Sequence, residues 1–117
     1  MKAEARDPVN APRIVLVTVP DVDAGRSLAR ITVMEGLAAC GNVIPGLTSI
    51  FRWDGELQED GEALVVLKTM ENSVEALRRR VVELHDYDVP EFLAIPITGG
   101  HEAYLRWVAE SVGGSGV

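Results

Sequence analysis

Hydrophobic positions near the start of the chain change from a continuous run to a helical spacing. The run of β-branched and aliphatic residues from Arg13 to Val19 predicts a central strand that is covered on at least one face. The following apolar residues recur every three or four positions, which predicts a helix capped by Asp21 or Asp23 that continues to about Ala39. We expect Gly41-Asn42 to end this helix in a left-handed conformation.

The middle of the chain has the pattern of a long β-hairpin. Two strand-like segments, 43–53 and 56–69, flank Asp54-Gly55, which is a strong signal for a tight hairpin turn. Pro45 lacks an amide proton, so we expect it at a bulge or a sheet edge. The four carboxylates between Glu56 and Glu62 are expected to be solvated near the tip. Long arms favour pairing with another chain, whereas a shorter hairpin with an acidic loop is the alternative.

The last part of the chain predicts two helices separated by a strand. Asn72 is expected to cap the first of these helices, with Glu75 as its capping-box partner. The segment 92–97 predicts a strand, and Pro96 indicates that this strand lies at a sheet edge. A short helix is then expected over 102–111. The predicted order is therefore β-α-β-β-α-β-α.

This order indicates an α+β fold, a ferredoxin-like βαββαβ sandwich with a long β-hairpin and a C-terminal helix. Two helices would cover one face of a four-stranded antiparallel sheet, and the third helix or a partner chain would cover the other face. We expect a single domain over 12–112, a flexible leader over 1–11 and a flexible tail over 113–117.

Composition narrows the possible functions. The chain has 117 residues, and its formal net charge of −7 argues against generic binding to nucleic acid. Cys40 is the single cysteine, so an intrachain disulfide is impossible and a reducing compartment is favoured. The sequence shows neither a signal-peptide pattern nor an apolar run of the roughly 18 residues that span a membrane. We therefore expect a cytoplasmic protein with no membrane partner.

One short segment combines the side chains that favour a borderline divalent cation. His85, Asp86, Asp88 and Glu91 fall within seven residues, and an imidazole with carboxylates suits copper or zinc. The alternative is a solvated acidic loop with a histidine that is stabilised by the helix dipole. Cys40 is a further candidate metal ligand, although a small buried side chain is the simpler interpretation.

Four residues are candidates for a ligand cleft. Trp53, Tyr87 and Trp107 each combine a wide apolar face with a polar group, as core or interface residues usually do. Lys68 interrupts an apolar strand, so it must reach solvent or meet an anion, and Glu91 is its expected partner.

The motifs of common enzyme classes do not occur. The sequence has no Gly-x-Ser-x-Gly, Walker or Gly-x-Gly-x-x-Gly motif, so we expect neither an enzyme nor an organic cofactor. A dyad of Cys40 and His85 rests on residue types alone.

Five segments together resemble the CutA family of divalent-ion tolerance proteins, over roughly 12–112. They are 37–46 (LAACGNVIPG), 48–55 (TSIFRWDG), Lys68-Thr69, 83–91 (ELHDYDVPE) and 104–107 (YLRW).

The resemblance implies a PII-like homotrimer of ferredoxin-like subunits, with hairpins that pair between neighbours and clefts between subunits. It also implies a link with tolerance of divalent ions, copper above all. Carried over by motif, the cleft would include Trp53, Lys68, His85, Tyr87 and Glu91, and Cys40 matches the motif cysteine. Asp86 departs from the proline that usually follows the histidine, and Gly41 stands where valine is common.

Three functions are open at this point. The first is binding of a divalent cation, copper or zinc, in metal-ion tolerance or response. The second is a PII-like trimeric sensor of a small anionic ligand, with Lys68 supplying charge between Trp53 and Tyr87. The third is a trimeric scaffold for protein partners.

Overall fold

The computed structural model describes residues 10–113, so most of the leader expected over 1–11 and of the tail expected over 113–117 lies outside the described residues. Seven elements follow in the expected order. They are β1 (Pro12–Val19), α1 (Val22–Met34), β2 (Cys40–Trp53), β3 (Glu56–Met70), α2 (Glu71–Leu84), β4 (Leu93–Pro96) and α3 (Glu102–Ser111). No helix within 10–113 is both long enough and apolar enough to cross a membrane.

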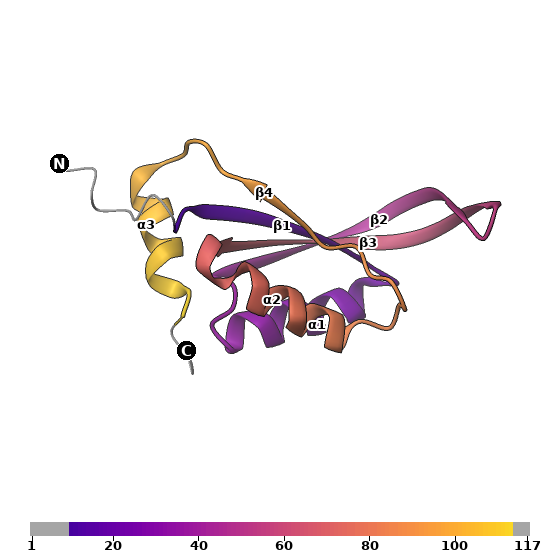
Figure 1. Cartoon of the computed structure of the whole chain (residues 1–117), viewed down its shortest axis with the longest axis horizontal. Coiled ribbons are helices and arrows are strands. Elements are labelled where there is room, and N and C mark those ends of the chain that lie inside the picture. The colour runs from indigo at the N-terminus through magenta and orange to yellow at the C-terminus, as the bar shows by residue number, and fades with distance from the viewer. Residues whose placement is uncertain (1–9, 114–117) are drawn as a thin grey trace.

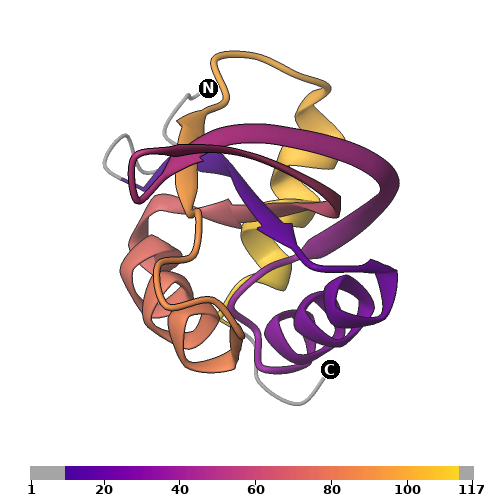
Figure 2. The same ribbon diagram turned by 90° about the vertical axis from the view of Figure 1, so that its right-hand side faces the viewer.

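The four strands form one antiparallel sheet in the order β2-β3-β1-β4. Both α1 and α2 lie on the same side of this sheet (Figures 1 and 2), as the ferredoxin-like arrangement requires. Because successive side chains on a strand point to opposite faces, β1 and β3 each send every second residue toward the helices. The fully buried core is made of these residues and their helical partners, Val15, Val17, Val65, Leu67, Leu77 and Val81.

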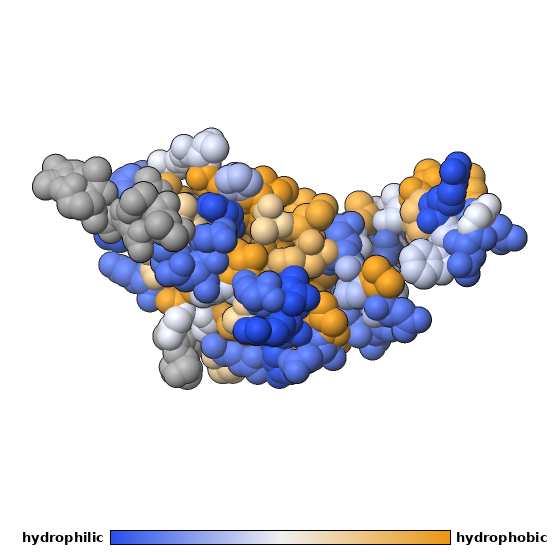
Figure 3. Space-filling view, viewed as in Figure 1, coloured by the Kyte–Doolittle hydropathy of each residue, from blue (hydrophilic) through white to orange (hydrophobic). Residues whose placement is uncertain are grey.

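The other side of the sheet, which we call the open face, is also apolar. The strand registers place one set of side chains there: Ile14, Leu16, Ile44, Leu64, Val66, Leu93 and Ile95. Figure 3 shows hydrophobic surface gathered over the middle of the sheet, around β1 and β4. The third helix covers only one end of this face, where Val108 of α3 packs with Ala39 and Met70, and it leaves the middle of the face exposed.

The hairpin of β2 and β3 extends well beyond the helices (Figure 1), and the molecule measures 53 × 28 × 23 Å. Its turn is the expected one, since Asp54 and Gly55 both have positive φ, 53° and 77°. The expected positions of the two strand prolines are also confirmed. Pro45 lies on edge strand β2 within the irregularity between Ile44 and Leu47, and Pro96 lies on edge strand β4.

The expected end of the first helix was wrong, because α1 ends at Met34 and not near Ala39. Gly36 takes a left-handed φ of 76° and stops the helix. Gly41, the expected stop, lies instead in β2, where it allows the strand to approach α1 closely. A Cβ atom at this position would lie 2.8 Å from the Cβ of Ala29.

The expected capping box of α2 was also wrong. Met70 occupies the N-cap position of α2 without a side-chain hydrogen bond, and Glu75 pairs with Arg78 instead. The amide of Asn72 donates to Oδ1 of Asn10 at 2.9 Å, and the amide of Glu71 donates to the carbonyl of Ala11. A distant segment therefore satisfies the first turn of this helix.

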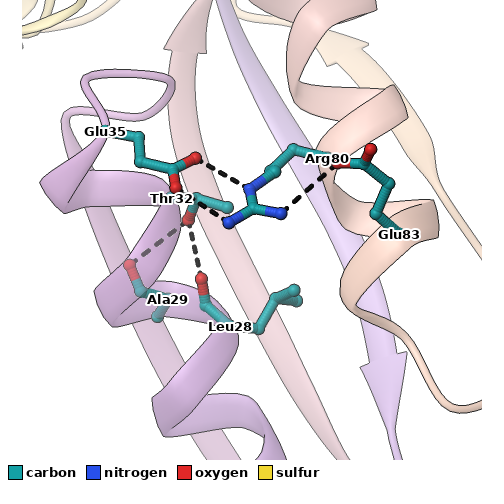
Figure 4. Close-up of polar contacts among 6 residues, drawn as sticks. All are labelled: Leu28, Ala29, Thr32, Glu35, Arg80 and Glu83. Atoms are coloured by element: carbon teal, nitrogen blue, oxygen red, sulfur yellow. Dashed lines mark hydrogen bonds and ion pairs between the residues drawn. The ribbon is translucent and has the colours of Figure 1, made fainter.

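An ion-pair network joins α1 to α2 at the surface (Figure 4). The Arg80 guanidinium donates to both carboxylate oxygens of Glu35, at 2.8 and 2.9 Å, and to Glu83 at 3.3 Å. The hydrogen bond from Arg80 lowers the pKa of Glu35. Beneath this network, the buried hydroxyl of Thr32 donates to the carbonyl of Leu28 at 2.9 Å, so no buried polar group is left unpaired there.

The close approach of β2 to α1 predicts that Gly41→Ala destabilises the fold by about 1–3 kcal/mol, since the methyl group of Ala29 cannot rotate away. Urea unfolding checks this value. Gly61→Ala is the matched control, because a Cβ there meets no atom within 4 Å and φ is not positive. Equal stability of the two variants would mean that α1 moves away freely.

Candidate functional site

A groove of about 730 Å³ opens between the base of the hairpin and the loop that follows α2. Its walls come from the end of β1, from β2, from β3 and from the loop 85–91. The lining residues are Thr18, Ser49, Ile50, Phe51, Trp53, Gln58, Asp60, Glu62, Asp86, Tyr87, Asp88, Val89 and Glu91.

A β-bulge determines which side chains of β2 point toward this groove. Ile44 pairs with Leu64, and Leu47 pairs with Glu62, so β2 advances three residues while β3 advances two. The extra residue reverses the alternation of side chains in the rest of β2. Gly46 makes this possible with a φ of 77°. As a result Phe51 and Trp53 lie on the same side of the ribbon as Glu62.

Aromatic rings line one wall of the groove. Trp53 is 50% exposed and Phe51 is 38% exposed, although both are large apolar side chains. Tyr87 also lines the groove, from the loop, where its ring packs against His85 with centroids 4.6 Å apart.

Two backbone hydrogen bonds hold the ring of His85. Its Nε2 lies 2.7 Å from the carbonyl oxygen of Thr18, and its Nδ1 accepts from the amide of Tyr87 at 3.1 Å. A carbonyl oxygen only accepts, so we assign the proton of the neutral ring to Nε2. Both ring nitrogens are therefore occupied, and His85 anchors the loop to β1.

A second link ties the loop to β3. The hydroxyl of Tyr87 donates to Oε2 of Glu62 at 2.6 Å. Burial raises the pKa of the Tyr87 phenol, and the bond to Glu62 raises it further. Tyr87 therefore stays neutral and remains a donor at physiological pH.

Five carboxylates surround the groove, from two sides. Asp60 and Glu62 project from β3, whereas Asp86, Asp88 and Glu91 belong to the loop. Burial raises the pKa of Glu91, and the negative charge of Glu62 adds to the shift. The ion pairs between side chains of residues 10–113 lie elsewhere, so none of them neutralises these carboxylates. They join Arg13 to Glu71, Arg78 to Glu75, and Arg80 to Glu35 and Glu83.

The predicted metal ligands only partly come together. Asp86, Asp88 and Glu91 line the groove, while His85 turns toward Thr18. Within the part of the chain that the structure describes, no three His, Cys, Asp or Glu side chains are close enough to hold a metal ion. One chain alone therefore offers carboxylates but no preformed ligand set.

Cys40 and Lys68 form a separate cluster on the open face. The ammonium of Lys68 donates to Asn42 and lies 3.9 Å from the sulfur of Cys40. The expected pairing of Lys68 with Glu91 was wrong within one chain. Lys68 is six residues along β3 from Glu62, or roughly 20 Å, which is too far from the groove.

The aromatic residues of α3 also lie with this second cluster. Tyr104 stands close to Cys40, and burial, followed by the effect of Cys40, raises the pKa of its phenol. Trp107 packs against Tyr104 with ring centroids 5.6 Å apart. Trp107 therefore does not line the groove that contains Trp53 and Tyr87.

Trp53 is the one hairpin residue of the groove that the sequence predicted. The acidic start of β3 was expected to be a solvated tip, yet Asp60 and Glu62 line the groove together with Phe51. The signal was present in the alternation of Gln58, Asp60 and Glu62, which places three polar side chains on one face of a strand.

Comparison with known proteins gives one consistent family. The family model described as CutA1 divalent ion tolerance protein matches residues 13–111. The divalent-cation tolerance protein CutA of Thermus thermophilus is 48% identical over 100 residues, which cover 86% of this chain and 97% of that protein. The chloroplastic protein CutA of Arabidopsis thaliana is 47% identical over 98 residues, 84% of this chain. The matched part spans about half of that plant protein, 54%.

Solved structures agree with this assignment. The Thermus thermophilus divalent cation tolerance protein superimposes with a TM-score of 0.85 at 47% identity, covering 87% of this chain and 99% of that one. CutA1 from Oryza sativa gives a TM-score of 0.85 at 44% identity, covering 92% and 99%. Sequence, topology and these likenesses together show that the chain belongs to the CutA1 divalent ion tolerance protein family.

Proposed function

We propose that this protein serves divalent-ion tolerance by binding a divalent cation, copper or zinc, at the acidic groove of a homotrimer. The observation that carries the proposal is the group of five carboxylates around one groove, with no ion pair to a basic side chain of residues 10–113. Burial raises the pKa of Glu91, and repulsion from Glu62 raises it further; a bound cation would relieve that repulsion.

The ligand set would be completed by a neighbouring subunit. The described residues of one chain hold no cluster of three ligands, so a second copy must bring groups to the groove or the loop must rearrange. His85 becomes a ligand only when one of its two backbone hydrogen bonds breaks. The groove carboxylates would therefore make the first contacts with the cation.

The open face supports the proposed trimer. Its apolar side chains lie on a sheet flanked by two edge strands, β2 and β4, that offer unpaired backbone groups. An exposed apolar face of this kind marks an interaction site in a soluble protein. Three copies that pack their open faces together, with hairpins paired to neighbouring edges, would cover both the apolar side chains and the edges.

The groove does not favour a small anionic ligand. Within one chain, Lys68, the residue that would supply positive charge, is bonded to Asn42 roughly 20 Å from Glu62 along β3. A carboxylate or phosphate group in the groove would meet five like charges. Cation binding is therefore the function that the geometry supports best.

Calorimetric titration with copper and zinc tests the cation site. Glu62→Gln with Glu91→Gln should weaken binding roughly tenfold or more, because two charges of the groove are lost while the side-chain shapes remain. Glu56→Gln with Glu59→Gln is the matched control, since it also removes two charges, from the same hairpin but outside the groove lining. Equal losses in the two proteins would mean that only the overall negative charge attracts the cation.

The raised pKa of Glu91 predicts a pH dependence. Protons compete with the cation for this carboxylate, so affinity should rise with pH as Glu91 ionises above the ordinary range of a glutamate. Titrations between pH 4.5 and 7 should show a shallower dependence in Glu91→Gln than in the wild-type protein. An unchanged slope in this variant would remove Glu91 from the site.

Light scattering after size exclusion tests the trimer. The expected mass is three times that of the 12.7 kDa chain. Leu93→Glu, on the open face, should give monomers because a charge cannot be buried there unpaired. Val82→Glu on α2 is the control, since its side chain is 44% exposed and that of Leu93 is 52% exposed. A wild-type monomer would contradict the proposed assembly.

A further inference from the structure

We draw no further inference here: the strongest candidate, the side-chain cluster at the α3 end of the open face in which the ammonium of Lys68 lies 3.9 Å from the sulfur of its cross-strand partner Cys40, rests on a lone cysteine, lies on a face that the proposed trimer covers, and has beside it no second observation that points to a ligand.

Discussion

The bulge in β2 is the constraint on which the functional surface depends. Side chains alternate with a period of two along a strand, so one extra residue between Ile44 and Leu47 exchanges the two faces for the rest of β2. Gly46 tolerates the left-handed conformation that this requires, and Pro45 lies on an edge strand where a missing amide is tolerated. Without the shift, Phe51 and Trp53 would face away from Glu62, and the groove would lose its aromatic wall.

The bulge also makes the groove and the open face parts of one surface. Thr18 lines the groove and follows Ile14 and Leu16 at alternate positions of β1. A chain that packs on the open face would therefore border the groove directly. Assembly and ligand binding would then be linked, because any movement of the hairpin base on ligand binding changes the edge of the apolar surface.

The sequence predicted those parts of the fold that are determined locally. The order of elements, the Asp54-Gly55 turn and the edge positions of Pro45 and Pro96 all follow from the conformations that these residues favour. Apart from the end of α1, which Gly36 sets locally, the errors involve distant partners. Asn10 satisfies the first turn of α2, which the local capping pattern around Asn72 could not reveal. Lys68 meets Asn42 only because of the strand register, which composition does not give.

The candidate site was predicted by residue type and corrected by geometry. An imidazole beside carboxylates suggested a metal ligand. In the structure, both ring nitrogens of His85 are hydrogen-bonded to backbone atoms, of Thr18 and of Tyr87. Each of these hydrogen bonds stabilises the loop by about 1 kcal/mol. Metal ligation by His85 would break at least one of them, so the metal–nitrogen bond would have to offset the lost stabilisation of the loop. A cation held by the carboxylates alone requires no such release. His85 is therefore better placed to position Asp86 and Tyr87 around the groove than to bind the first cation that enters it.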